Sequence, residues 1–154
     1  MPATWLIVLA WVGLVVGFAS AAVIAYDIYG RRHRQQMSVM EAVWPITALY
    51  MGPGALWGYR RFGQPMSPSW RRQRGLTAPP DKPGWAATGV GVSHCGAGCT
   101  LGDLIAEVVI FALGASIAGV TVYAEMLGDY LAAVGLGIIF QYFAIAPHAR
   151  TLPP

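Results

Sequence analysis

Two cysteines and a histidine stand together in the segment SHCGAGCTLGDLIAE, residues 93–107. Cys95 and Cys99 are the only cysteines of the chain, and His94 directly precedes the first of them. Thiolate sulfur and imidazole nitrogen select soft or borderline ions such as Cu(I) and Zn(II). We therefore expect a soft transition-metal site, copper first and zinc second, in which Cys95 and Cys99 are primary ligands and His94 is a third or outer ligand.

Acidic residues follow the cysteines at helical spacing. Asp103 and Glu107 continue the four-residue spacing of the two thiols, so an unbroken helix would place all four side chains on one face. Ionisable groups inside a membrane are costly and usually functional. We expect Asp103 and Glu107 to act as further metal-site residues that stabilise the cation or relay protons. Glu125 and Asp129 are expected to line an ion or proton path, with a solvated turn capped by Asp129 as the alternative.

Other chemistries remain open for these residues. A membrane thiol–disulfide oxidoreductase linked to quinone is one alternative, although the chain has neither a CxxC motif nor a second cysteine pair. A non-catalytic accessory or assembly subunit of a membrane complex is another. A haem held by His94 with His33 or His148 is the least favoured, because the last two stand in loop-like sequence. Binding or passage of an ion is favoured over enzymatic turnover.

The composition indicates which environment must position these residues. Hydrophobic residues make up 56% and charged residues 11% of the chain, against a charged share of about 25% in soluble domains. The mean hydropathy is +0.52. A soluble domain of this size could not bury so much apolar surface, so the expected partner is a lipid bilayer. Nucleic-acid binding is not expected, since the basic residues flank apolar spans.

The apolar runs predict an all-α, polytopic membrane helix bundle that forms a single domain over residues 1–154. About four transmembrane helices are expected, at residues 4–28, 39–59, 101–123 and 130–146. Residues 60–84 are rich in proline, glycine and arginine and are expected to form a basic linker of the cytoplasmic type.

The second of these spans carries strong helix-breaking signals. Pro45 and the triplet Gly52-Pro53-Gly54 predict a kink or a break. A re-entrant hairpin is the alternative, and it would put every basic loop on one side of the membrane. A returning arm of residues 55–59 is too short to climb back from the middle of the bilayer, so a kinked full span is favoured.

The cysteine motif is expected to form an elbow before the third span. Thr100 and Asp103 match a T-x-x-D capping signal, and Gly96 and Gly98 disfavour a continuing helix. Residues 85–100 would then be a half-inserted segment. Helices broken at membrane depth are a recurring way to build binding sites, so the elbow would hold the metal.

Several glycines are assigned to helix packing. Gly13 and Gly17 form a GxxxG pair in the first span, and Gly114 and Gly119 accompany the third. Glycine lets helix backbones approach closely in lipid. Packing within one chain is favoured over dimerisation for this pair, while a homo-oligomer or partner membrane subunits both remain open.

The basic residues orient the chain. Nine of the ten lie between Arg31 and Lys82, which is typical of loops that face anionic headgroups. Asp27 and Glu41 flank the first arginine-rich loop and are expected to pair with it. With four spans, the positive-inside rule favours both termini in the cytoplasm, in a multi-pass protein of the bacterial inner membrane.

The motif HCGAGCTLGD, together with VWPITALYMGP and the closing QYFAIAP, resembles a family of bacterial integral membrane proteins catalogued as domain of unknown function 4396. The resemblance extends over nearly the whole chain, and the ten-residue cysteine motif is its specific part. It implies a small multi-helix membrane domain. It implies no established activity, so the functional expectations rest on the residues themselves.

Overall fold

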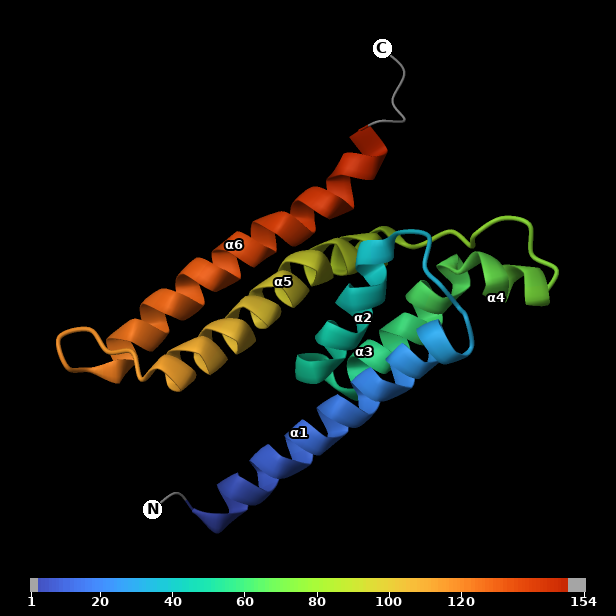
Figure 1. The fold of residues 1–154 in the computed structure, drawn as a ribbon. Coiled ribbons are helices and arrows are strands. Elements are labelled where there is room, and N and C mark those ends of the chain that lie inside the picture. Colours follow the sequence, from blue (N-terminus) through green and yellow to red (C-terminus); the bar gives the residue numbers. More distant parts are fainter. Residues whose placement is uncertain (1–2, 150–154) are drawn as a thin grey trace. The chain divides into compact units, whose positions relative to one another are not determined.

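The computed structural model describes the backbone of residues 3–149 and the side chains of residues 3–145, and this part of the chain is all-α (Figure 1). The chain divides into two compact units, Met1–Thr88 and Gly89–Pro154. Within the described residues, three helices are long and apolar enough to cross a membrane: Thr4–Gly30, Gly84–Leu113 and Thr121–Ile145.

The first unit begins with a long apolar helix. α1 (Thr4–Ala25) continues into a π-helical turn, η1 (Tyr26–Gly30). No charged residue precedes Asp27 in the sequence, and most side chains of α1 are exposed, as suits a helix whose solvent is lipid. The predicted first span, residues 4–28, agrees with this helix.

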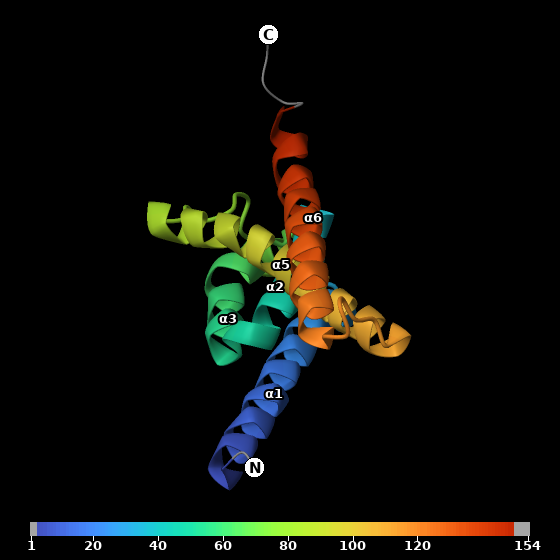
Figure 2. The ribbon, with the colours of Figure 1, turned by 90° about the vertical axis from the view of Figure 1, so that its left-hand side faces the viewer.

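A helical hairpin packs against α1 (Figures 1 and 2). α2 (Ser38–Met51) forms its first arm. The second arm is built from α3 (Pro53–Gly58), the π-helical turn η2 (Tyr59–Gly63) and the 3₁₀ turn η3 (Gln64–Met66). We call residues 53–66 the return arm.

The expected kinked full span over residues 39–59 is therefore wrong, and the chain reverses instead. Gly52 has φ +53°, a left-handed conformation that glycine adopts without strain. The edge-to-face contact of Trp44 with Tyr59, 5.6 Å between ring centroids, holds the two arms together. The return arm is longer than the sequence analysis assumed. Its helical turns continue to Met66, whereas only residues 55–59 were considered for a returning arm.

The hairpin reaches the middle of α1. A Cβ atom added to Gly17 would lie 2.6 Å from the carbonyl oxygen of Leu49, and one added to Gly52 would lie 3.6 Å from a methyl group of Val16. Gly17 is the midpoint of the span Thr4–Gly30. The tip of the hairpin thus lies level with the centre of the span, and its open end lies level with η1.

The basic linker is partly helical. The return arm leads into α4 (Pro68–Gln73), and residues 74–83 contain no helix. Ser69 donates a hydrogen bond of 2.7 Å to the carbonyl oxygen of Arg32, so α4 is tied to the loop that follows α1. The irregular linker expected over residues 60–84 is therefore confined to its second half.

The second unit is an antiparallel pair of long helices. α5 (Gly84–Leu113), whose first turn belongs to the first unit, has 30 residues and α6 (Thr121–Ala149) has 29. The turn between them uses positive φ angles at Gly114 and Gly119. Close contacts at glycines follow the length of the pair. Near the turn, Gly128 lies against the side chain of Ile110, and further along Gly98 lies against the backbone of Leu136.

The expected elbow at residues 85–100 is wrong, because α5 is uninterrupted from Gly84 to Leu113. Thr100 does not cap a helix; its hydroxyl donates 2.9 Å to the carbonyl oxygen of Gly96, one turn earlier in the same helix. Gly98 is a contact point for α6 rather than a helix breaker. The spans expected at residues 101–123 and 130–146 are replaced by α5 and α6, which begin earlier.

The number of spans also bears on topology. An even number of crossings places both termini on one side of a membrane, as the expected N-in, C-in arrangement requires. Three crossings would place the termini on opposite sides. The hairpin is not among the candidate spans, and its tip lies level with the midpoint of the span Thr4–Gly30.

Candidate functional site

Cys95 and Cys99 form a dithiol on α5. Their sulfur atoms lie 3.9 Å apart, one helical turn along the same face, and both thiols are free. On α6, a Cβ atom added to Gly137 would lie 3.2 Å from the sulfur of Cys99 and 3.7 Å from that of Cys95. Because Gly137 has no side chain, α6 leaves room for the two sulfurs.

His94 is buried but does not join the dithiol. Successive residues of a helix are about 100° apart around its axis, and no group of three or more His, Cys, Asp or Glu side chains suited to a metal ion occurs among the described residues. The Nδ1 atom of His94 lies 2.9 Å from the carbonyl oxygen of Val90. Since a carbonyl only accepts, Nδ1 carries the hydrogen. The Nε2 atom is buried without a hydrogen-bond partner in the described part of the chain.

The carboxylates of α5 meet those of α6. Asp103, Glu125 and Asp129 are close enough to Glu107 for their negative charges to act on it. One oxygen of Asp129 is buried and lacks a hydrogen-bond partner among the described side chains. Glu125 and Asp129 therefore lie within α6 and interact with α5, instead of flanking a solvated turn.

Continuity of α5 places four polar side chains on one face. We call Cys95, Cys99, Asp103 and Glu107 the polar stripe. It covers twelve residue steps, or about 18 Å at 1.5 Å per residue, compared with a hydrocarbon core of about 30 Å. The stripe lies at the exposed edge of the contact with α6, since Gly137 neighbours its cysteine end while Cys95, Asp103 and Glu107 are exposed.

The glycines assigned to packing have different positions. Gly17 contacts α2 closely, as described above, whereas nothing lies within 4 Å of a Cβ atom added to Gly13. Gly114 and Gly119 occupy turn conformations after α5. Sequence reasoning missed Gly98 and Gly102, although their GxxxG spacing was a usable signal.

The contact at Gly102 shows how closely the two helices approach. A Cβ atom added there would lie 2.5 Å from the carbonyl group of Ala132, closer than any real side chain allows. The α5–α6 pair is therefore joined by direct backbone contact on the face of α5 next to the polar stripe.

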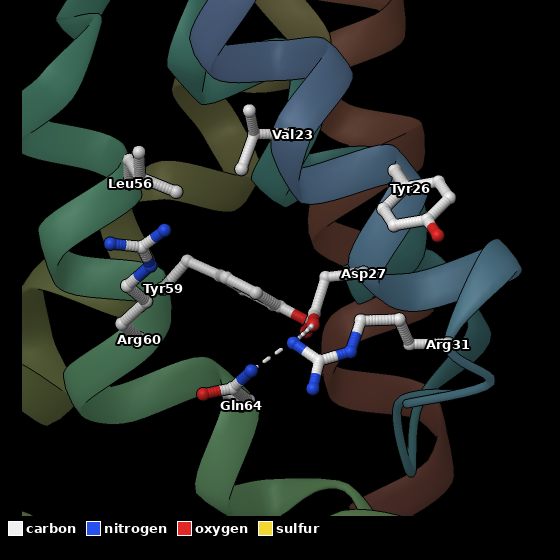
Figure 3. Close-up of a pocket in the computed structure, with 8 residues that line it drawn as sticks. All are labelled: Val23, Tyr26, Asp27, Arg31, Leu56, Tyr59, Arg60 and Gln64. Atoms are coloured by element: carbon white, nitrogen blue, oxygen red, sulfur yellow. Dashed lines mark hydrogen bonds and ion pairs between the residues drawn. The ribbon is translucent and has the colours of Figure 1, made fainter.

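A second polar centre, which the sequence did not reveal, lies at the open end of the hairpin (Figure 3). Asp27 is 7% exposed and accepts hydrogen bonds from Tyr59 at 2.7 Å and Gln64 at 2.9 Å. His33 lies 3.1 Å from the same carboxylate, and Arg31 pairs with it at 3.4 Å. We call this group the Asp27 hub; it joins the end of α1 to the return arm.

Two further observations describe the hub and its loop. Burial and the hydrogen bond to Asp27 raise the pKa of Tyr59 above its ordinary value, so the phenol is a donor. The predicted pairing of Asp27 and Glu41 with the arginine-rich loop is confirmed, because Arg34 pairs with Glu41 at 2.8 Å and Asp27 pairs with Arg31. His33 is buried within the hub, and the side chain of His148 lies outside the described residues.

The long apolar helices and the polar groups along them define a multi-pass helical membrane protein. Residues 84–153 match the model of a family described as "Domain of unknown function (DUF4396)". The match includes the cysteine motif and QYFAIAP, while VWPITALYMGP lies before it. No curated protein and no solved structure matches the chain.

Proposed function

We propose that this membrane protein binds and passes a soft transition-metal ion, copper first and zinc second, along the contact between α5 and α6. Cys95 and Cys99 are the primary ligands. The single observation that supports this proposal best is the dithiol, in which two free sulfurs on one helix face lie 3.9 Å apart beside the empty side-chain position of Gly137.

The sulfur separation suits chelation. Two metal–sulfur bonds of about 2.3 Å span 3.9 Å at a sulfur–metal–sulfur angle of about 115°. Structural zinc sites close with four protein ligands, whereas no described group of His, Cys, Asp or Glu offers three. Cu(I) is softer and tolerates lower coordination numbers, so a pair of thiolates favours copper.

The remaining polar groups extend the site. A hydrogen bond from Nδ1 to a backbone carbonyl, as His94 makes with Val90, is typical of metal-binding histidines; we assign His94 to the outer sphere. Asp103 and Glu107 continue the stripe, and Glu125 and Asp129 add negative charge from α6. These carboxylates would compensate the charge of a cation or carry protons as it passes.

The continuous helix disfavours thiol–disulfide exchange. A disulfide needs Cβ atoms about 3.5–4.5 Å apart, whereas side chains four residues apart on a helix have Cβ atoms separated by about 5–6 Å. A Cys95–Cys99 bond would therefore require local unwinding of α5. The metal-binding experiment below distinguishes the proposal from the alternative of an accessory subunit.

Metal binding is tested on the purified protein in detergent. Cu(I) is supplied anaerobically against a coloured chelator, and the wild type is compared with the double variant Cys95→Ser/Cys99→Ser. Ser93→Ala is the matched control, because the hydroxyl of Ser93 only donates to the carbonyl oxygen of Gly89 at 2.9 Å. We expect about one Cu(I) per chain in wild type and control, with affinity at least tenfold lower in the double variant. Equal, negligible metal in all three would contradict the proposal and favour an accessory subunit.

Passage is tested separately from binding. In proteoliposomes, Glu107→Gln is expected to slow copper entry without lowering the copper content of the purified protein, because Glu107 belongs to the stripe but not to the dithiol. An unchanged rate of copper entry would contradict the assignment of the carboxylates to the proposed path.

A further inference from the structure

The first unit contains a cavity at the open end of the hairpin (Figure 3). Its volume is about 120 Å³. Its polar wall combines residues from the end of α1 with residues from the return arm: Asp27, Arg31, Tyr59, Arg60 and Gln64. The cavity therefore lies beside the Asp27 hub and is separate from the polar stripe of the second unit.

The cavity carries positive charge that Asp27 does not neutralise. The negative charge of Asp27 is already met by donors within the hub. Arg31 contacts it at a long 3.4 Å, and the Arg31 side chain is 61% exposed. Arg60 has no ion-pair partner among the described side chains. Figure 3 shows the two arginines on different elements, one at the end of α1 and one on the return arm.

The other wall of the cavity is apolar. Val23, Leu56 and the ring of Tyr26 line it, and Val23 and Tyr26 are 44% and 67% exposed. An apolar wall that opens outward from a membrane helix offers a surface to an acyl chain. Two arginines beside such a wall suit both the phosphate group and the acyl chain of a phospholipid.

The position of the cavity matches the depth of lipid headgroups. Its residues belong to the last turns of the span Thr4–Gly30 and to the return arm beside them. The hairpin begins and ends at this level, so the loops before α2 and after the return arm emerge together. They carry seven of the ten basic residues of the chain, and such loops face the anionic cytoplasmic surface.

We propose that this cavity binds the phosphate group of an anionic phospholipid, with Arg31 and Arg60 as its charged ligands. The cavity volume of about 120 Å³ leaves room for a phosphate group. Arginine forms short, charge-assisted hydrogen bonds with phosphate oxygens. The proposal rests on the membrane assignment and does not depend on metal binding.

The test measures binding of a soluble short-chain phosphatidylglycerol to the purified protein in uncharged detergent. Arg60→Gln removes one charged ligand, and Arg72→Gln removes the same charge from an exposed position of α4, outside the cavity. Leu56→Phe narrows the cavity without changing its charge. We expect affinity to fall about tenfold in Arg60→Gln, since one charge-assisted contact is lost, to fall in Leu56→Phe, and to stay within twofold in Arg72→Gln.

Further arms identify the source of the phosphate and guard against a folding defect. Inorganic phosphate and short-chain phosphatidylcholine are titrated in parallel. Binding of phosphatidylglycerol alone supports the lipid, whereas equal, Arg60-dependent binding of inorganic phosphate assigns the same site to free phosphate. Equal losses in Arg60→Gln and Arg72→Gln, or unchanged binding in Leu56→Phe, would overturn the proposal, because surface charge would then explain the attraction. Circular dichroism checks that each variant is folded. If Arg60→Gln does not fold, lipid binding by Leu56→Phe tests the proposal instead.

Discussion

Replacing Tyr59 by phenylalanine removes one hydroxyl from the centre of the Asp27 hub. Tyr59 is fully buried, and its ring keeps its edge-to-face contact with Trp44 in the variant. The volume change is small, so no sizeable cavity is expected. The perturbation is therefore the loss of a 2.7 Å hydrogen bond to a buried carboxylate.

The magnitude follows from the charge of the acceptor. Hydrogen bonds to charged groups contribute about 1.5–3 kcal/mol, and a buried acceptor left short of donors adds to the cost of losing one. The matched control is Tyr50→Phe, because Tyr50 is 49% exposed and its hydroxyl lies 3.5 Å from Thr47, at the limit of a hydrogen bond. We expect a cost below about 0.5 kcal/mol for the control.

The assay is thermal unfolding in mild detergent, followed by circular dichroism. For a chain of this size 1 kcal/mol corresponds to about 2–4 °C, so Tyr59→Phe should lower the midpoint by on the order of 5–10 °C relative to Tyr50→Phe. Because the folded pKa of Tyr59 is raised, the phenol contributes fully below the unfolded pKa of about 10 and loses this contribution only as pH rises further. The difference should thus be constant from pH 7 to 9. Equal midpoints of the two variants would refute the hub as a stabilising contact.

Two further predictions concern the second unit. Gly102→Ala should destabilise the protein by about 1–3 kcal/mol, because the new methyl group meets the backbone of Ala132. The control Gly89→Ala, on an open face of α5, should be neutral or stabilising by up to about 1 kcal/mol. Thermal midpoints that fall equally in the two variants would contradict close packing at Gly102. Treatment of the folded protein with a mild thiol oxidant should leave Cys95 and Cys99 open to alkylation, as counted by mass spectrometry, and rapid formation of an internal disulfide would show that α5 unwinds at this point.

The class of protein and the first span could be predicted from the sequence. An uncharged run before Asp27 is long enough to form a spanning helix whatever lies next to it. The ion pairs of Asp27 and Glu41 with nearby arginines were also predictable, since the partners are close in the chain. The shared face of Cys95 and Glu107 needed only the helical period, once the helix is known to be continuous.

The hairpin and the uninterrupted α5 could not be predicted, because glycine can either end a helix or stay within one. Gly52 reverses the chain with a left-handed φ, whereas Gly98 and Gly102 stay helical and let α6 approach. Local propensity ranks all three as helix breakers. Which role each adopts depends on what packs against it, and a neighbouring helix can repay the cost of a glycine inside a helix.

The sequence by itself determined that the protein is an all-α membrane chain with one concentrated set of thiols and carboxylates, because composition and periodicity are local properties. Only the tertiary structure decided which groups meet. Asp27 and Gln64 are 37 residues apart in the chain and 2.9 Å apart in space, and Gly137 of α6 lies beside the sulfur of Cys99 on α5. Such contacts depend on where the chain reverses, and a reversal is stabilised by the packing of two distant segments against each other.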